Sequence, residues 1–516
     1  MASTTGRPGV FVSESLIPLT STPDTPGQAL AAFVGTHNSG PVGPTLLTSW
    51  ADWRNRFGGF GNGSDLLPFS VYQFFANGGS QCYVVRAVSS DADSATVTLN
   101  DVQTTPDPVV TFTALSPGVS GNALYVSITA KSPSTGRFDV TLRSGSTMSA
   151  PVEQWMDVSL NPSDPRNLIA MIGSGGSGSK LISATYEGPA AWSTTNTPGT
   201  QANTPLSGGV DGSAAVNLVD AAKRLDAVDD ILNVNLPGVS DATVLNPLIA
   251  WAAASGSRFM VVDGPAASAG GVGDTFTAYK NLSPLGTSSG TPLTSSSYVA
   301  VYGPWMNFRD PSSQAAGATR LLPPGGAVLG LYSVADATDG VQQAAAGVDF
   351  PIRGALSPEV RFANGDLDTL NQLQINVIRV IPGADGAVPM GARTLAGGMP
   401  DRYVPIRRTL MYLTRLCVRT TNFAVFRPNN EGLWDQISSL LTDQLSMLQQ
   451  AGVLKGATAQ DAFYVRCDAT NNTENSVANG IVNVEVGVAL NTPAEYIIIQ
   501  IGQMASGATA SDNLTS

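Results

Sequence analysis

The C-terminal part of the chain, from Tyr403 to Gln503, carries its most regular pattern and little glycine or serine filler. It reads as alternating helices and strands and closes on the apolar run 493–501 (PAEYIIIQI), which predicts a strand. An exposed apolar strand pairs readily with another chain, so few monomers leave one open. The fold must therefore supply a partner for this strand, from the same subunit or from another one.

The clearest element in this part is its second helix, whose apolar residues fall on one side at helical spacing and whose polar residues fall on the other. The apolar side consists of Leu433, Trp434, Ile437, Leu440, Leu441, Leu445 and Leu448. Asn429 or Asn430 can cap the start of this helix, and Gly452 stands where its end favours a left-handed residue. The pattern predicts a compact C-terminal α/β unit.

Length and composition limit the classes of protein. A chain of 516 residues predicts roughly three to five domains. Charged residues make up only 13% of it, and 54 glycines with 34 prolines suit a sheet-rich and loop-rich protein. The net charge of −12 argues against general nucleic-acid binding, which needs clustered Lys and Arg. We therefore expect no nucleic-acid partner.

The three cysteines, Cys82, Cys417 and Cys467, are too few and too scattered for a disulfide framework or a zinc site. We expect buried thiols in a reducing compartment, and no metal. The first residues show no charged stretch followed by an apolar run, so we expect no signal peptide. No apolar stretch of about 18 residues occurs, so we expect no membrane insertion.

Periodicity and composition predict a mixed α/β, multi-domain chain. Pro8, Pro18, Pro23 and Pro26 exclude a helix near the N-terminus, and this polar arm cannot fold alone. The predicted parts are an extended N-terminal arm (1–28), an α/β unit (29–88), an all-β insertion (89–208), a middle α/β domain (209–374), a C-terminal domain (375–503) and a flexible C-terminal tail (504–516).

Individual elements follow from the same signals. In the unit 29–88 we expect a strand at 31–35, helices at 50–57 and 66–76, the second capped by Ser64, and a strand at 82–86. In the middle domain we expect helices at 214–227 and 242–254 that alternate with strands at 231–236, 259–262 and 298–302, and a helix opened by Pro323-Pro324-Gly325. This alternation is typical of βαβ units and a partly parallel sheet.

No group of residues supports catalysis. Residues 173–178 (GSGGSG) match a dinucleotide fingerprint in letters, but no helix is predicted directly after them. His37, the single histidine, stands in a turn sequence and is expected to be a solvated loop residue. Asp263 follows a predicted strand, where catalytic acids often lie, but a turn explains it equally well. We expect no enzyme, no catalytic residue and no cofactor.

One charged segment exceeds the background. Between Arg379 and Arg427 eight arginines and two acids leave a local charge of +6. On a predicted helix from Tyr403 to about residue 420, one face holds Arg408, Arg415 and Arg419, and the opposite face holds Ile406, Leu410, Leu413 and Cys417. These arginines either pair with acids of their own chain or dock an acidic partner through bidentate contacts.

Ordered motifs along nearly the whole chain resemble the contractile tail sheath proteins of bacteriophages and related injection machines. The motifs are 8–14 (PGVFVSE), 33–35 (FVG), 40–42 (GPV), 57–59 (FGG), 83–88 (YVVRAV), 118–124 (GVSGNAL), 302–305 (YGPW), 323–326 (PPGG), 376–379 (NVIR), 391–395 (GARTL), 407–408 (RR), 426–434 (FRPNNEGLW), 462–473 (AFYVRCDATNNT) and 493–497 (PAEYI). No single motif decides the resemblance, but their order is specific.

The resemblance implies a structural subunit that stacks as hexameric rings around an inner tail tube and contracts to drive the tube through the host cell envelope. It implies as partners copies of the same chain, the tail tube protein, and baseplate and tail terminator proteins. It implies a place in the virion tail after assembly in the host cytoplasm. The unit 29–88 would pack with the C-terminal domain, and the insertion would face outward.

In this family each subunit lends terminal segments to sheets of its neighbours. The resemblance, together with the N-terminal arm and the apolar run 493–501, predicts strand exchange between subunits. The predicted residues are Val10, Phe11, Val12, Tyr496, Ile497, Ile498, Ile499 and Ile501. Arg408, Arg415 and Arg419 then become candidates for the tube-facing surface. Two other hypotheses are a secreted binding protein, suggested by the Ser/Thr-rich insertion, and a nucleotide-dependent enzyme, suggested by the glycine run.

Overall fold

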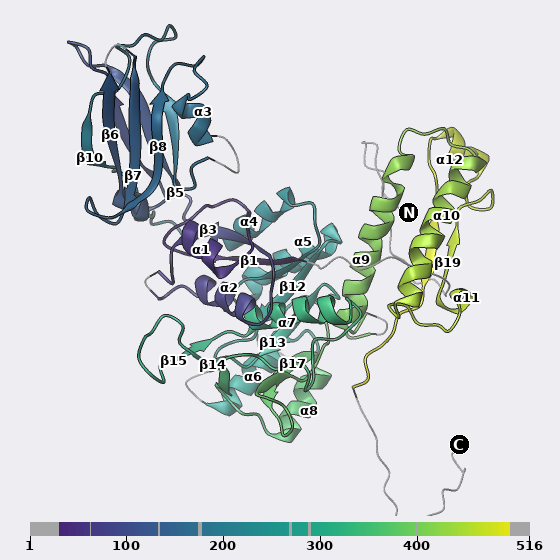
Figure 1. The fold of residues 1–516 in the computed structure, drawn as a ribbon. Coiled ribbons are helices and arrows are strands. Elements are labelled where there is room, and N and C mark those ends of the chain that lie inside the picture. The colour runs from purple at the N-terminus through teal and green to yellow at the C-terminus, as the bar shows by residue number, and fades with distance from the viewer. Residues whose placement is uncertain are drawn as a thin grey trace, which may run out of the picture.

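The computed structural model describes residues 30–61, 63–132, 135–173, 178–267, 271–286, 290–398 and 401–495. The predicted strand-exchange residues Val10, Phe11, Val12, Tyr496, Ile497, Ile498, Ile499 and Ile501 lie outside these ranges, as do the arm 1–28 and the tail 504–516. The described residues form a central sheet domain, a β-rich insertion and a helical C-terminal unit (Figure 1).

The central domain is built on an eight-stranded sheet with the order β18-β17-β13-β12-β11-β1-β3-β2. Its strands are β1 (Leu30–Thr36), β2 (Thr45–Leu47), β3 (Cys82–Ala87), β11 (Leu232–Asn235), β12 (Arg258–Asp263), β13 (Val299–Gly303), β17 (Ile375–Val380) and β18 (Ala387–Pro389). The inner six are parallel, and the edge strands β2 and β18 are antiparallel. All residues of β12 and β13 are buried, as expected for a parallel sheet covered on both faces.

Two groups of helices cover this sheet. α2 and α7 pack on each other and against β1, β11 and β12, while α4 and α5 pack on each other and against β1, β3 and β12. The helices of the domain are α1 (Trp50–Phe57), α2 (Leu67–Ala76), α4 (Leu218–Lys223) with the 3₁₀ turn η3 (Arg224–Ala227), α5 (Ala242–Ser255), α6 (Val272–Leu282), α7 (Gly325–Thr338) and α8 (Asn364–Gln372). A small sheet of β14 (Met306–Arg309), β15 (Thr319–Leu322) and β16 (Ala355–Pro358) completes it.

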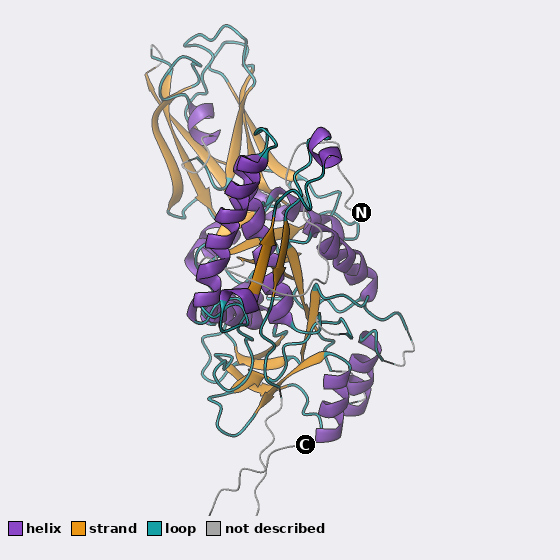
Figure 2. Cartoon of the chain, turned by 90° about the vertical axis from the view of Figure 1, so that its right-hand side faces the viewer, coloured by secondary structure: helices purple, strands orange, loops and turns teal. Residues whose placement is uncertain are grey.

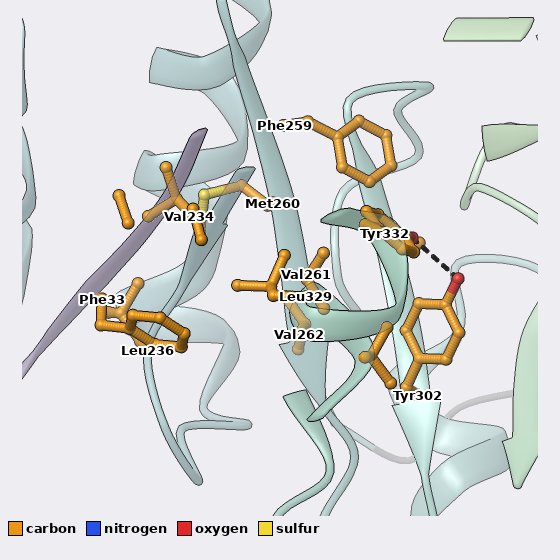
Figure 3. Close-up of a cluster of buried hydrophobic side chains, with 14 of the residues drawn as sticks. Phe33, Val234, Leu236, Phe259, Met260, Val261, Val262, Tyr302, Leu329 and Tyr332 are labelled. Atoms are coloured by element: carbon orange, nitrogen blue, oxygen red, sulfur yellow. Dashed lines mark hydrogen bonds between the residues drawn. The ribbon is translucent and has the colours of Figure 1, made fainter. Parts of the chain in front are cut away.

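The packing of α7 on α2 explains the glycines that open α7. A Cβ at Gly326 would lie 2.3 Å from the Ser70 carbonyl oxygen, and one at Gly330 would lie 2.7 Å from the Phe74 carbonyl oxygen. Only glycine allows the two helix backbones to approach this closely. Behind this contact, apolar side chains of the sheet and α7 form a continuous core that includes the Tyr302–Tyr332 hydroxyl pair, 2.8 Å apart (Figure 3).

This sheet corrects the predicted domain boundaries. β1 pairs in parallel with both β3 and β11, so the unit 29–88 and the middle domain share one sheet. The described part of the unit 29–88 therefore belongs to the central domain. β17 and β18 also belong to this sheet, so the C-terminal unit begins at about 401 rather than 375.

The predicted helices occur in the structure, and two of them begin at other residues than expected. α1, α5 and α7 begin where the sequence predicts, and α5 is capped by Asp241. The cap assigned to Ser64 is wrong, because Leu66 is the N-cap of α2 and no side chain bonds to it. The helix expected from 214 begins only at Leu218, where Asn217 caps α4 by accepting a hydrogen bond from the Asp220 N–H.

The insertion is almost purely β (Figure 2). It contains β4 (Ser94–Asn100), β5 (Pro108–Pro117), η1 (Val119–Ala123), β6 (Leu124–Ser132), β7 (Arg137–Ser144), β8 (Pro151–Ser159), α3 (Leu168–Gly173), β9 (Ile182–Tyr186) and β10 (Gln201–Pro205). Its sheets, ordered β4-β5-β9 and β10-β6-β7-β8, enclose a hydrophobic core of their own. The alternation of buried and partly exposed residues along β7 matches the predicted half-buried strands.

Arg86, at the end of β3, joins the insertion to the central domain. Its guanidinium donates to the carbonyl oxygens of His37 and Gly40 in the central domain, and to the Ser116 hydroxyl and the Pro117 carbonyl at the end of β5. The residue is only 2% exposed, and burial lowers its pKa to about 10. A second contact lies nearby, where Asp91 accepts hydrogen bonds from the backbone N–H groups of the returning chain at 213 and 214.

We expect Arg86→Met to lower the free energy of unfolding by about 3 kcal/mol, because several buried acceptors lose their donor at once and each such loss costs about 1–3 kcal/mol. It should also widen the range of orientations between the insertion and the central domain. Chemical denaturation and small-angle X-ray scattering measure the two effects. Arg143→Met is the matched control, because Arg143 donates only within the insertion, to Ser127 and Asn203. Equal effects of both variants would contradict a joint at Arg86.

The C-terminal unit consists of α9 (Val404–Thr421), η4 (Asn422–Ala424), α10 (Glu431–Gln450), α11 (Ala459–Ala462), β19 (Phe463–Arg466), α12 (Glu474–Ala478) and β20 (Glu485–Val488). Asn430, one of the two predicted caps, accepts a hydrogen bond from the Leu433 N–H at the start of α10. Gly452, just after α10, has the expected positive φ of 75°. The predicted apolar side of α10 is buried except for Leu440, which is 37% exposed.

Candidate assembly site

The helix α9 connects the central domain to the C-terminal unit (Figure 1). Val404 and Met411, in its first part, belong to the core of the central domain. Leu413 belongs to the core of the C-terminal unit, together with Leu445 of α10 and Phe463 of β19. A single helix therefore contributes to both cores and joins the two bodies.

Arg408 is not on the surface, and its predicted tube-facing role is wrong. It is 3% exposed, and its guanidinium forms an ion pair with Asp336 of α7 and lies 4.5 Å over the ring of Tyr332. The physical reason is that the first part of α9 enters the central domain, so its arginine face packs against α7. The intramolecular interpretation of the arginines holds for this residue.

Arg415 and Arg419, about two and about three turns beyond Arg408 along α9, pair with the loop that precedes β11. Arg415 lies 2.6 Å from Asp229, and Arg419 lies 3.2 Å from Asp230. The Arg415 hydrogen bond lowers the pKa of Asp229. The Arg419 side chain is 61% exposed, so it remains accessible to a partner. Contact of these two arginines with a tube stays a prediction.

Acids from distant parts of the chain neutralise much of the local +6 charge. Arg407 pairs with the nearby Asp401, but Arg393 pairs with Glu495, and the acids Asp229, Asp230 and Asp336 also lie outside the arginine-rich segment. A charge count along a window of sequence misses such partners, because only the fold brings them together. The adjacent acids at 229 and 230 were the one available signal.

The C-terminal unit also holds a two-stranded antiparallel sheet of β19 and β20. The strands are joined by side chains as well, since Arg466 and Tyr464 of β19 both donate to Glu485 of β20. α10 covers one face of this sheet. Within the described residues neither strand pairs with a third one, so the sheet has two open edges. Two-stranded sheets are marginal alone, and open edges accept further strands.

His37 is buried, so its prediction as a solvated loop residue is wrong. It is 5% exposed, its Nε2 lies 2.9 Å from the Phe57 carbonyl oxygen, and its ring lies beside that of Trp53. The turn sequence around it folds back against α1, which buries the ring. His37 Nδ1 lies 3.7 Å from the Asp65 carboxylate, and this interaction lowers the pKa of Asp65.

Asp263, at the carboxyl end of β12, is a structural acid. It is fully buried and accepts hydrogen bonds from Asn235, from the Gly238 N–H and from the Gly325 N–H that opens α7. Burial raises its pKa to about 6. Its carboxylate oxygens are thus occupied by the ends of neighbouring elements, which leaves no geometry for general acid or base chemistry.

The glycine run 173–178 begins at the end of α3 and is followed by β9, so the described part of it does not open a helix as a dinucleotide site requires. Cys82 and Cys467 are buried, and Cys417 is partly exposed. No group of side chains that could hold a metal ion occurs among the residues that the structure describes. None of the helices in those ranges is long and apolar enough to cross a membrane.

The segment that begins where the central sheet ends, residues 401–503, matches the model of the phage tail sheath C-terminal domain. No curated protein sequence matches the chain. The family model thus covers the unit that holds α9, α10 and the open β19–β20 sheet.

Solved sheath structures extend the likeness to nearly the whole chain. The sheath of an extracellular contractile injection system (PVC), contracted, is 21% identical, with a TM-score of 0.56 over 98% of this chain and 99% of that chain. The contracted helical sheath of the anti-feeding prophage is 20% identical, with a TM-score of 0.54 over 97% of this chain and 100% of that chain. A sheath tail protein from Listeria innocua is 14% identical, with a TM-score of 0.59 over 91% of this chain and 96% of that chain. At these identities the likeness establishes the fold, so the chain has the fold of contractile sheath proteins.

Proposed function

We propose that this chain is the sheath subunit of a contractile tail or injection system, a structural protein and not an enzyme. The observation that carries the proposal is the similarity to sheath structures over at least nine-tenths of both chains, together with the family match of residues 401–503. A similarity of this extent covers the central domain, the insertion and the C-terminal unit. No cofactor is needed, because the work of contraction comes from the free-energy difference between two packings of the subunits.

The subunit polymerises by strand exchange. The β19–β20 sheet offers two open edges, and the sequence offers two apolar segments, Val10 to Val12 and Tyr496 to Ile501, that can add to sheet edges of neighbouring copies. Strand addition joins subunits by backbone hydrogen bonds, so the joint survives reorientation of the rigid bodies on either side. Such joints suit an assembly that must stay connected while it contracts.

In the finer form of the proposal, hexameric rings of subunits stack around an inner tail tube between a baseplate and a tail terminator. Contraction drives the tube through the host envelope and delivers the genome, and the particle assembles in the host cytoplasm as part of the virion. The candidate tube contacts are Arg415 and Arg419. The exposed guanidinium of Arg419 supports this, since charge complementarity with an acidic tube favours docking.

The purified protein is expected to form long hollow tubes at micromolar concentration, visible by negative-stain electron microscopy. The physical reason is that each subunit carries both the donor segments and the open sheet edges, so association has no natural end until a cap binds. Light scattering coupled to size exclusion gives the control measurement of mass. A stable monomer at high concentration, with no tubes in the microscope, would contradict the proposal.

A further inference from the structure

We infer that Arg393 and Glu495 form an anchor that fixes, on the central sheet domain, the point from which the C-terminal strand leaves the subunit. The inference rests on the proposed function, because it assigns these two residues the task of positioning the strand for exchange. It concerns only residues up to 495, which the structure describes.

Just before Glu495 the chain runs from the C-terminal unit to the central domain. Leu490 still belongs to the C-terminal unit, where it bridges Leu454 beside the β19–β20 sheet, and the Asn491 side chain donates to the Gly452 carbonyl oxygen. Glu495, a few residues later, contacts the central domain. By residue 495 the chain has therefore crossed back from the C-terminal unit to the central domain.

The arginine that receives Glu495 is built into the central domain. Arg393 is 6% exposed, and its Nε lies 2.8 Å from Glu495 Oε1 while its Nη2 donates to Oε2. Its Nη1 donates to the Asn371 carbonyl oxygen at the end of α8. Its backbone exchanges two hydrogen bonds with the side chain of Asn376 in β17. A planar guanidinium held in this way presents a preformed fork to one carboxylate.

The pair is shielded from water, which strengthens it relative to the exposed pairs on α9. The side chains of Arg393 and Glu495 are 7% and 17% exposed, whereas Asp229, the partner of Arg415, is 91% exposed. Tyr403, the N-cap of α9, adds a hydroxyl 3.4 Å from the Glu495 carboxylate. Salt screens buried pairs less than exposed ones, so this contact persists at physiological ionic strength.

A mechanical consequence follows from this placement. Tension on a strand lent to a neighbour would act first at the point where the strand leaves its own subunit. With the anchor in place, Glu495 is held by Arg393, and Arg393 is hydrogen-bonded to Asn376 of β17. The load would therefore pass to the eight-stranded sheet and not to the two-stranded β19–β20 sheet. Arg393 and Glu495 are thus positioning residues: they set where the strand starts and which body bears its load.

The anchor itself can be tested on the unassembled subunit. Spin labels at Thr492→Cys and Asp368→Cys, both exposed sites, in a Cys417→Ala background, report the distance between the crossing chain and α8. We expect a narrow distance distribution in the parent and a broad one after Glu495→Ala. Glu495→Ala leaves the buried Arg393 guanidinium without its carboxylate and is expected to lower the thermal stability, so circular dichroism first establishes that the variant is folded at the temperature of the distance measurement. Equal distributions in parent and variant would overturn the inference.

The assembly test uses the same variant in the full-length chain. We expect Glu495→Ala to lose tubes in negative stain, while Asp310→Ala, which removes a carboxylate that pairs with Arg320 elsewhere in the central domain, keeps them. Glu495→Asp, which preserves the charge, should restore part of the assembly. If the wild-type chain forms tubes and Glu495→Ala forms them equally well, the anchor is wrong. If the wild-type chain forms no tubes, the proposed function fails. The distances between the spin labels still show whether Glu495 holds the crossing chain on the central domain.

Discussion

Replacement of Arg408 by alanine is expected to lower the free energy of unfolding by about 3–5 kcal/mol, the largest effect of any single arginine on α9. The substitution leaves the Asp336 carboxylate buried at 3% side-chain exposure without its ion-pair partner, and it removes the cation from the face of Tyr332. Denaturant unfolding monitored by circular dichroism measures the change.

Arg419→Ala is the matched control, because it removes the same side chain from the same helix at a site that is 61% exposed. Its expected cost is at most about 1 kcal/mol, the usual value of an exposed ion pair. A double variant, Arg408→Met with Asp336→Leu, removes both buried charges and should be more stable than Arg408→Ala alone. If Arg408→Ala and Arg419→Ala cost the same, the buried pair does not hold α9 to α7.

The position of α9 in the chain follows from local sequence signals, whereas the exposure of its arginines depends on the fold. The helix α9 was predicted within a residue or two, because the spacing of its apolar residues is a local signal. Which arginines face solvent was not predictable from that spacing. The face of α9 that carries the arginines packs against the central domain near its start and is exposed to solvent further along. Arg408 is therefore buried, while Arg419 is exposed.

The domain boundaries failed for a related reason. The pairing of β1 with β11 joins Leu30 to Leu232 across the whole insertion, and the change in composition at 89–208 hides the continuity of the sheet. Parallel strands connect through crossovers, so no turn signal marks which strands are neighbours. The anchor of Glu495 on Arg393 is equally non-local. The sequence marked both segments as motifs, but only the fold shows that they meet.

A proline at Val465 is expected to abolish polymerisation and leave the subunit folded. The Ala489 N–H donates to the Ala462 carbonyl oxygen, so residues 462 and 489 are a hydrogen-bonded pair at the end of the β19–β20 ladder. Hydrogen-bonded pairs alternate along an antiparallel ladder, so the N–H groups of Val465 and Val486 point away from the partner strand toward the open edges. Proline removes this outward donor without breaking an inner bond, and edge positions whose N–H faces solvent tolerate proline.

The matched control is Val465→Ala, which loses the same packing against α10 but keeps the N–H. Val486→Pro tests the other edge in the same way. Thermal unfolding establishes that each variant folds, and negative-stain microscopy with sedimentation measures tubes. If the edge of β19 accepts a strand from another subunit, Val465→Pro stays in the supernatant and Val465→Ala forms tubes as the parent does. Tubes from both proline variants would mean that subunits join elsewhere, and the strand-exchange role of the β19–β20 sheet would have to be given up.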